Sequence, residues 1–437
     1  MEKHLLVVSI DAMVYEDLEY AKTLPNFKKV FERASVIEKV RTIYPTLTHP
    51  IHATILSGAT AGKTGIVNNS MFNRTAPDKD SGVWFNELSQ IKCDTLIHAA
   101  HRAGLTVAVS TWPVTTGDCG VIDYLVPGAL NSCFEGREDD PLSVYRSLGA
   151  GENVMDIIEE GVRRYGWRDQ HPEVDFFQAY CLAQIIKRYK PNLMLTHLGN
   201  VDSDRHKFGV FGDKINEAVR LNDGWLGELL SALSEAGIED STDIVLLSDH
   251  GQIGVTRGVS PNVALVENGY IDLSESGDVS DYRAYAKSAG GSCQIYLKNP
   301  QDTETKNGVF KLLSGMAKEG VWGFERVFEA DELKEKYGFY GDFSFVLETD
   351  GYSFFSEWLL PPYSRTVQLG NYKYGKGKHG HEPSKGPQPI FIGAGPSFAQ
   401  GVILESGSIL NHGPTLAKIL GVELLDSDGQ VEEKLLK

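Results

Sequence analysis

Five short apolar runs, each rich in valine, isoleucine or leucine, constrain the fold of this chain more than any other feature. They read LLVVSID, TVAVSTW, LMLTHL, DIVLLSD and PIFIGAG, and amphipathic stretches such as LPNFKKVFERA and INEAVRLNDGWLGELLSAL lie between them. Continuous apolar runs of this length are typical of strands buried on both faces, and the stretches between them have helical periodicity. The pattern predicts an α/β fold, with a central, mostly parallel sheet and helices on both faces.

Two stretches interrupt this alternation. The first runs from Cys119 to about Pro172 and is polar, and the second spans about 268–364 and mixes turns, acidic residues and aromatics. We interpret the second stretch as an inserted cap subdomain. The remaining residues, 1–267 and 365–437, form the predicted catalytic core.

Charge and composition restrict the partners of the chain. A net charge of -17 argues against a nucleic-acid polymer or an anionic membrane, because both need a basic face. No apolar run approaches the roughly eighteen residues of a membrane span, and the start MEKHLLVVSID enters a strand without the features of a signal peptide. The five cysteines form no CxxC pair, so we expect reduced thiols. We therefore predict a cytoplasmic protein that acts on a small molecule, in an oligomeric state that the sequence does not indicate.

Acidic and histidine side chains follow the predicted strands at their carboxyl ends, where ligands bind in open α/β sheets. Asp11 ends the first run, Asp202 and His206 stand in THLGNVDSDRH, and Asp249 and His250 stand in LLSDHG. Alone, each has a plainer interpretation as a helix cap, a turn or a surface residue. Together, three carboxylates and two imidazoles at one edge would repel and desolvate one another unless a cation lies among them. This mixture of donors suits Zn²⁺ or a similar divalent ion.

A further histidine, His379, stands in the turn-rich segment GKGKHGHEPSKG just before PIFIGAG. The glycines of this segment spell G-x-G-x-x-G, but no strand precedes them and no helical pattern follows, so a dinucleotide site is not indicated. They predict instead a loop that folds tightly around a ligand. His381 and His52 compete with His379 for a ligand role, although a lone histidine is more often structural.

Thr48 is the predicted nucleophile, because it stands at the start of the helical stretch PIHATILSG. Pro50 favours the first turn of a helix, and Gly58 ends it. The free N–H groups and the positive end of the helix dipole favour a phosphate there, and a divalent metal can activate the hydroxyl. Thr46 and Thr54 are weaker candidates, the first for its spacing and the second because it lies inside the helix. A plain N-cap is the alternative interpretation of Thr48.

The downstream stretch LSGATAGKTG looks like the phosphate-binding loop of a P-loop NTPase. That loop needs a glycine five residues before the Gly-Lys-Thr, but Ser57 stands five before Gly62, and Gly58 comes one position too late. A loop that is one residue short closes on the wrong radius. The stretch is therefore interpreted as the connection from the nucleophile helix to Asn69.

These motifs, in this order, resemble the alkaline phosphatase superfamily, and most closely its type I phosphodiesterase/nucleotide pyrophosphatase branch. The resemblance rests on SID, YPTLTHPIHATILSGATAGKTGIVNN, VDSDRH, SDHG and KHGHEP, and it does not cover about 268–364. It implies two divalent metal ions per chain, Zn²⁺ or alternatively Mn²⁺. It implies one site made by Asp202, His206 and His379, and another made by Asp11, Asp249, His250 and Thr48. It also implies that Asn69 holds a phosphoryl oxygen.

The resemblance implies a metal-dependent hydrolase of phosphodiester bonds, including nucleotide pyrophosphate bonds. Thr48 would attack phosphorus and form a covalent phosphothreonine intermediate, which water would release from the opposite side. A phosphomonoester hydrolase, a phosphonate hydrolase and a phosphomutase of the same superfamily are the alternatives. A sulfatase is not indicated, because no Cys/Ser-x-Pro-x-Arg setting surrounds Thr48.

Departures from the family pattern guide the prediction of the substrate. Nucleotide-hydrolysing members have an aromatic residue after the nucleophile and a tyrosine five residues before the aspartate of D-x-x-x-H, where this chain has His49 and His197. Histidine offers less apolar area for a nucleobase, so we expect a relaxed or non-nucleotide preference. The pair Trp112–Pro113 resembles the phosphodiesterase branch and replaces the lysines of phosphonate hydrolases. We expect the substrate to contact His49, Asn69, Trp112 and His197.

Overall fold

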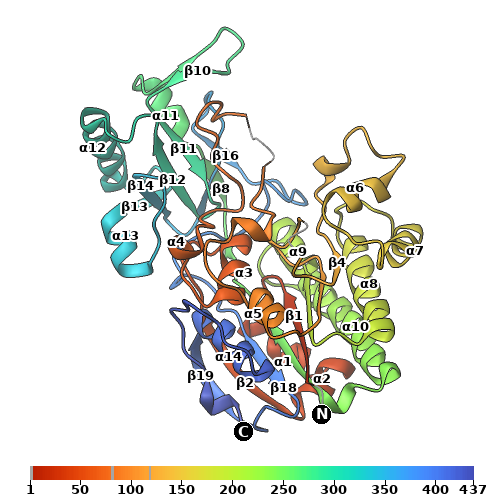
Figure 1. Cartoon of the computed structure of the whole chain (residues 1–437). Helices are drawn as coiled ribbons and strands as arrows, with labels where there is room; N and C mark the ends of the chain where they lie inside the picture. The colour runs from red at the N-terminus through yellow and green to blue at the C-terminus, as the bar shows by residue number, and fades with distance from the viewer. Residues whose placement is uncertain (1–2, 80–82, 118–119) are drawn as a thin grey trace.

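An eight-stranded sheet forms the centre of the computed structural model, which describes residues 3–79, 83–117 and 120–437 (Figure 1). The predicted reduced thiol Cys119 lies outside these residues. In spatial order the strands are β19 (Ile403–Ser408), β2 (Ala34–Arg41), β18 (Phe391–Ala394), β6 (Thr242–Leu247), β1 (His4–Ile10), β5 (Leu193–Leu198), β3 (Val107–Ser110) and β4 (Tyr124–Val126).

One strand runs against the others. β18 pairs antiparallel with both of its neighbours, β2 and β6, whereas the pairs that join the other strands are parallel. The predicted mostly parallel sheet is confirmed, but the expectation of a parallel strand at PIFIGAG is wrong. The reversal has a structural consequence, because it places the residues that precede β18 at the edge where the parallel strands end.

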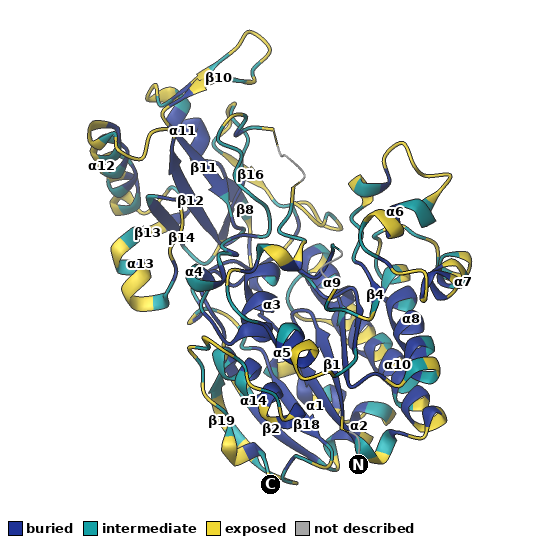
Figure 2. Cartoon of the chain, in the orientation of Figure 1, coloured by how far each residue is buried: buried dark blue, intermediate teal, exposed yellow. Residues whose placement is uncertain are grey.

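Helices cover both faces of the sheet, as predicted. One hydrophobic core includes α2 (Pro25–Phe31), α7 (Met155–Tyr165), α8 (Glu173–Tyr189) and α10 (Asp213–Ala236), and the other includes α3 (Thr48–Ser57), α5 (Leu96–Arg102) and α14 (His412–Leu420). β1 contributes alternate residues to the two cores, Leu6 to the first and Leu5 to the second, which is why the strand reads as an unbroken apolar run. Figure 2 shows the sheet buried between the helices.

A second, four-stranded antiparallel sheet lies beside the core. Its strands are β11 (Ala284–Ser288), β12 (Ser292–Leu297), β14 (Phe345–Thr349) and β13 (Phe324–Glu329), and α12 (Thr303–Glu319) packs against it, followed in the chain by α13 (Ala330–Tyr337). Its hydrophobic core also takes in Val259, Ala264 and Leu265, which precede residue 268. The division of the chain at 268 and 364 stays a prediction, and we call residues 268–364 the cap.

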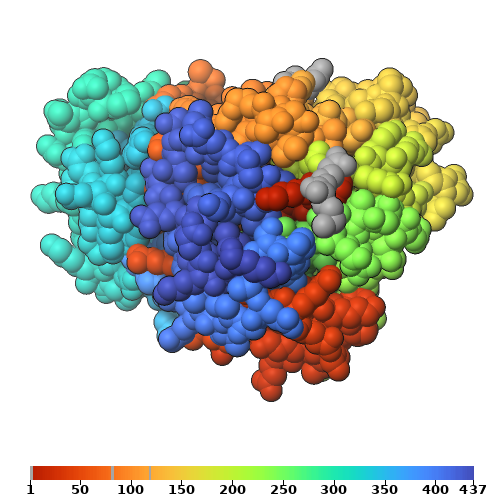
Figure 3. Space-filling view, turned by 60° about the horizontal axis from the view of Figure 1, so that its bottom comes forward, coloured from red at the N-terminus to blue at the C-terminus, as the bar shows by residue number. Residues whose placement is uncertain are grey.

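Shorter elements complete the chain. The helices among them are α1 (Leu18–Ala21), α4 (Ala61–Thr64), α6 (Pro141–Ser147), α9 (Asn200–Phe208) and α11 (Pro261–Glu267). The strands are β7 (Ile253–Gly254), β8 (Arg257–Val259), β9 (Ile271–Leu273), β10 (Val279–Tyr282), β15 (Ser353–Phe355), β16 (Ser364–Thr366) and β17 (Gly377–Lys378). The cap and the α6–α7 segment lie on opposite sides of the core, in teal to cyan and in yellow in Figures 1 and 3.

None of the described helices is long and apolar enough to cross a membrane. The cysteines among the described residues are free, as expected: Cys93, Cys133, Cys181 and Cys293. The cytoplasmic location stays a prediction.

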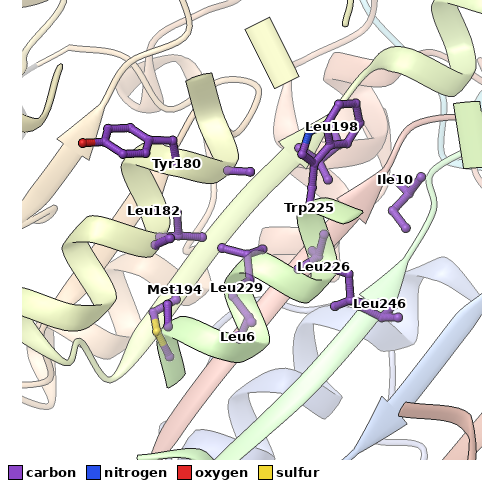
Figure 4. Packing of buried hydrophobic residues seen from close by; sticks show 14 of the residues in the cluster. Leu6, Ile10, Tyr180, Leu182, Met194, Leu198, Trp225, Leu226, Leu229 and Leu246 are labelled. Atoms are coloured by element: carbon purple, nitrogen blue, oxygen red, sulfur yellow. The ribbon is translucent and has the colours of Figure 1, made fainter. Parts of the chain in front are cut away.

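Replacing Leu246 of β6 by alanine tests the packing of the core. Leu246 is fully buried and packs, with Leu6, near Leu226 and Leu229 of α10 (Figure 4). We expect Leu246→Ala to lower the free energy of unfolding by about 2–5 kcal/mol, because it removes buried methyl groups and leaves a cavity. Denaturant unfolding measures this change. The control Leu369→Ala, at a side chain that is 69% exposed, is expected to change it by less than about 0.5 kcal/mol.

Candidate active site

The six residues predicted as metal ligands lie at one edge of the central sheet. Asp11 and Asp249 follow β1 and β6, and Asp202 lies in α9, which follows β5. His379 precedes β18, and it reaches the same edge because β18 runs antiparallel. The structure brings the six together in two buried groups, in each of which one ligand atom per residue lies within 4.8 Å of the others: Asp202, His206 and His379, and Asp11, Asp249 and His250. We call them the Asp202 group and the Asp11 group.

Backbone carbonyls orient the histidines of the Asp202 group. His206 Nδ1 lies 2.7 Å from the Gly377 carbonyl oxygen, and His379 Nδ1 lies 2.9 Å from that of Thr46. A carbonyl can only accept, so each Nδ1 carries the proton and each Nε2 keeps its lone pair. Burial lowers the pKa of His206 to about 4, which keeps its ring neutral. Both Nε2 atoms lie near the Asp202 carboxylate, at 3.3 and 3.7 Å, and can serve a metal with it.

The Asp11 group concentrates negative charge. His250 Nε2 lies 3.2 Å from Asp249 Oδ2 and 3.5 Å from Asp11 Oδ1. Burial, together with the charges of Asp249 and Asp202, raises the pKa of Asp11 well above its usual value, and burial lowers that of His250. Asp11 Oδ1 and Asp249 Oδ2 are buried and accept no hydrogen bond from any described residue. The donor set therefore fits a divalent cation, which would satisfy these oxygens and offset their repulsion.

Thr48 stands beside the Asp11 group. It is the first residue of α3, and its Oγ1 lies 3.2 Å from His250 Nε2. The N-cap of α3 is Leu47, so the interpretation of Thr48 as a plain N-cap is wrong. Gly58 ends the helix in the left-handed conformation, as expected.

The competing candidates are engaged elsewhere. The Thr46 hydroxyl donates to the His381 carbonyl and accepts from the Gly380 N–H. The Thr54 hydroxyl donates to the Ala59 carbonyl just beyond α3. His52 is fully buried, with Nδ1 at 2.7 Å from the Thr48 carbonyl oxygen and Nε2 at 2.8 Å from Ser9 Oγ. His52 therefore supports the segment that carries Thr48. His381 and His52 belong to neither of the two groups.

A backbone hydrogen bond orients the side-chain amide of Asn69. Its Oδ1 accepts a hydrogen bond of 3.0 Å from the backbone N–H of His49, which fixes the orientation of the amide. The backbone N–H of Asn69 donates to Asn68 Oδ1, and the Asn68 amide donates in turn to Gln294 of β12. The cap thus positions a predicted substrate contact through Asn68.

The other predicted substrate contacts line a cavity of about 200 Å³ together with Thr48, and we call it the first cavity. His197 does so with little freedom, since its Nε2 lies 3.2 Å from Asp11 Oδ2 and its Nδ1 lies 3.2 Å from Ser9 Oγ. The His49 ring meets Trp84 edge to face at 5.0 Å. Trp112 Nε1 has no hydrogen-bond partner among the described residues.

Because Ser9 holds the His197 ring beside Asp11, His197 orients the Asp11 carboxylate. The sequence did not indicate this contact.

Two side chains that the sequence did not indicate, Gln252 and Tyr372, contact the Asp202 group. Gln252 donates a hydrogen bond to Asp202 Oδ1, and the Tyr372 hydroxyl lies 3.4 Å from Asp202 Oδ2. The Tyr372 ring also lies against His206, with 4.5 Å between centroids. Gln252 could have been suspected, because it stands three residues after Asp249 in the same turn. Nothing in the sequence pattern around Tyr372 singles it out.

The structure explains both glycine-rich motifs without a phosphate-binding loop. Gly380 has φ of +94°, and a Cβ there would lie 1.6 Å from the Ala289 carbonyl oxygen. The glycine thus permits a close approach of the cap backbone next to His379. That this loop folds around a ligand stays a prediction. In the other motif, Lys63 forms an ion pair of 2.9 Å with Asp428.

Fold and site together define an alkaline phosphatase-like α/β protein with a threonine beside two candidate metal groups. A family model described as type I phosphodiesterase / nucleotide pyrophosphatase matches residues 5–382, and the chain belongs to this family. The matched range includes residues 268–364, which the resemblance noted from sequence did not cover.

Individual relatives are distant in sequence. Bovine ectonucleotide pyrophosphatase/phosphodiesterase family member 3 is 22% identical over 97% of this chain and 43% of its own length, and venom phosphodiesterase from Naja atra is 23% identical over 58% and 26%. The chain thus spans less than half the length of these relatives. Murine ectonucleotide pyrophosphatase/phosphodiesterase 5, solved as an inactive variant in complex with AMP, superposes with a TM-score of 0.68 at 18% identity, with both chains fully covered. This likeness shows the fold.

Replacing Asp11 by asparagine tests whether the Asp11 carboxylate is repelled by those of Asp249 and Asp202. The raised pKa means that the metal-free protein loses stability as pH rises above the unfolded-state pKa of Asp11, until the folded carboxyl is also ionised. In chelator at pH 8, Asp11→Asn is therefore expected to raise the free energy of unfolding by about 1–3 kcal/mol. With excess divalent metal we expect wild type to be the more stable of the two proteins, because it gains the binding energy of the ion.

Denaturant unfolding in both conditions measures this reversal. The control Asp240→Asn, at an exposed carboxylate, is expected to change neither value by more than about 0.5 kcal/mol. A loss of stability of Asp11→Asn in chelator would contradict the account of the site.

Proposed function

We propose that this chain is a metal-dependent phosphodiesterase with Thr48 as its nucleophile. The observation that carries the proposal is the position of Thr48, whose hydroxyl lies at the start of α3 and within 3.2 Å of His250 in the Asp11 group. The names of the relatives support the same reaction class. A cytoplasmic location is part of the proposal.

The two groups would each hold one divalent ion, with Thr48 completing the shell of the Asp11 group. Carboxylate and imidazole donors suit Zn²⁺, and Mn²⁺ is the alternative. Bound there, the ions would activate the threonine hydroxyl and offset the charge that develops on the phosphoryl and leaving oxygens.

The residues of the chain have separate roles in the proposed reaction. Thr48 Oγ1 forms a bond to phosphorus while the bond to the leaving oxygen breaks; the hydroxyl proton passes to solvent, and the departing alcohol takes a proton from water. Asn69 donates an amide N–H to a non-bridging oxygen, and the N-terminus of α3 favours its negative charge. In-line geometry places the leaving alcohol opposite Thr48, on the side of the Asp202 group. Water then cleaves the phosphothreonine bond from that side.

The charges around the site favour a diester over a monoester. Among the described residues, no arginine lines the first cavity or the larger cavity next to the Asp202 group. Lys373 and Lys378 line the larger cavity, and the Lys378 ammonium donates to the carbonyls of Tyr372 and Lys373. A lysine does not offer the two-pronged contact of an arginine. The extra negative charge of a monoester therefore finds no bidentate partner.

Matched aryl substrates test this proposal. We expect kcat/KM for methyl 4-nitrophenyl phosphate to exceed that for 4-nitrophenyl phosphate by at least about tenfold with Zn²⁺ or Mn²⁺. Thr48→Ala is expected to lower the diesterase rate at least about a thousandfold with both ions still bound. Release of 4-nitrophenol measures both effects.

Thr48→Ser is the matched control, because it keeps a hydroxyl at the same position, and it is expected to retain part of the activity. A preference for the monoester would make the chain a phosphomonoesterase or a phosphomutase of the same fold. Full activity of Thr48→Ala would remove Thr48 from the mechanism.

A further inference from the structure

Two cavities of unequal size adjoin the candidate metal groups. The first cavity, of about 200 Å³, touches Thr48, Asp11 and also Asp202, and it extends toward the α6–α7 segment. The second cavity, of about 550 Å³, touches His206 and His379 and lies against the cap. Asn69, Trp84 and Tyr372, as well as His379, line both, so the cavities meet at the site.

Their positions relative to Thr48 assign a role to each cavity. An in-line attack by Thr48 expels the leaving alcohol toward the Asp202 group. The second cavity adjoins this group and does not touch Thr48 or Asp11, so it lies where the leaving alcohol departs. The first cavity reaches Thr48 and Asp11 as well as Asp202, so it adjoins the attacked phosphorus and holds the alcohol that stays on it in the intermediate.

An aromatic wall fixes the size of the first cavity. Its far end is lined by Tyr145, Trp167 and Phe177. Phe134 packs behind them, with its ring 4.4 Å from Trp167 and 5.8 Å from Tyr145, and Tyr145 lies 5.6 Å from Phe177. Tyr145, Phe177 and Phe134 are part of the hydrophobic core. Tyr145 and Phe177 therefore cannot shift without disturbing that core, and the half-buried Trp167 packs against it.

Next to Thr48, the first cavity presents two histidine rings whose positions are fixed by other side chains. The His197 ring is held by Ser9 and Asp11, and the His49 ring is held edge to face against Trp84. A volume of about 200 Å³ falls below the roughly 300–1,000 Å³ of pockets for drug-sized ligands. The second cavity falls within that range, and Phe354 and Trp358 line it but not the first cavity.

We infer that this enzyme cleaves asymmetric diesters in one orientation, with a compact alcohol retained on phosphorus and a bulky aromatic alcohol leaving through the second cavity. The inference rests on the proposed function and adds the class of each alcohol. Trp167 sets the size limit on the retained side. Trp358, whose Nε1 is fixed by a hydrogen bond of 2.9 Å to the Pro362 carbonyl, contacts the leaving group.

Two diesters with the same leaving group test the retained side. We expect kcat/KM for methyl 4-nitrophenyl phosphate to exceed that for thymidine 5′-(4-nitrophenyl) phosphate by at least about tenfold. Trp167→Ala opens the first cavity and is expected to reduce this ratio at least about fivefold, mainly through a lower KM for the thymidine ester. Tyr165→Ala is the control, because Tyr165 stacks on Phe176 nearby but lines neither cavity, and it is expected to leave the ratio unchanged.

A second pair of variants tests the leaving side. Trp358→Ala is expected to raise KM for methyl 4-methylumbelliferyl phosphate more than for methyl 4-nitrophenyl phosphate, whereas Trp322→Ala, at a cap tryptophan that lines neither cavity, is expected to change neither. A wild-type preference for the thymidine ester, or a ratio unchanged by Trp167→Ala, would overturn the inference. Neither result would contradict the proposed phosphodiesterase function. Hydrolysis of neither nitrophenyl diester would overturn the proposed function and the inference with it.

Discussion

The concentration of buried negative charge at one edge of the central sheet is the constraint on which the site depends. Asp11, Asp202 and Asp249 are all nearly or fully buried there. Burial and the charges of Asp249 and Asp202 raise the pKa of Asp11 well above its usual value. Burial lowers the pKa values of His206 and His250 and so favours their neutral rings. Divalent cations resolve the conflict, and the same neutral histidines supply lone pairs to them.

The fold meets this constraint by bringing distant segments to a single edge. Parallel strands deliver the carboxylates at their carboxyl ends, and the reversed strand β18 delivers His379 from its amino end. The cap contributes from the other side, since the Ala289 backbone approaches Gly380 and Gln294 reaches Asn69 through Asn68. Cap and core therefore position the proposed nucleophile and its substrate contact together.

The sequence indicated the parts of the site that follow a local pattern. Asp11 and Asp249 directly end apolar runs, and Thr48 begins a helix whose proline and glycine mark both ends. Contacts between segments distant in the chain have no local pattern in the sequence that would predict them. The role of His197 depends on strand register, because β1 and β5 pair Ser9 with His197, and the direction of β18 depends on its path through the sheet. The size of the first cavity depends on ring contacts between segments far apart in the chain.

The number of metal ions bound per chain decides whether the two buried groups are metal sites. Protein freed of metal by chelation and then dialysed against Zn²⁺ or Mn²⁺ can be analysed for bound ions per chain. We expect two ions in wild type and one after either Asp202→Ala or Asp249→Ala, because each variant removes a ligand from one of the two groups. A wild-type protein that hydrolyses the diester with fewer than two ions per chain, or two ions retained in either variant, would contradict this expectation.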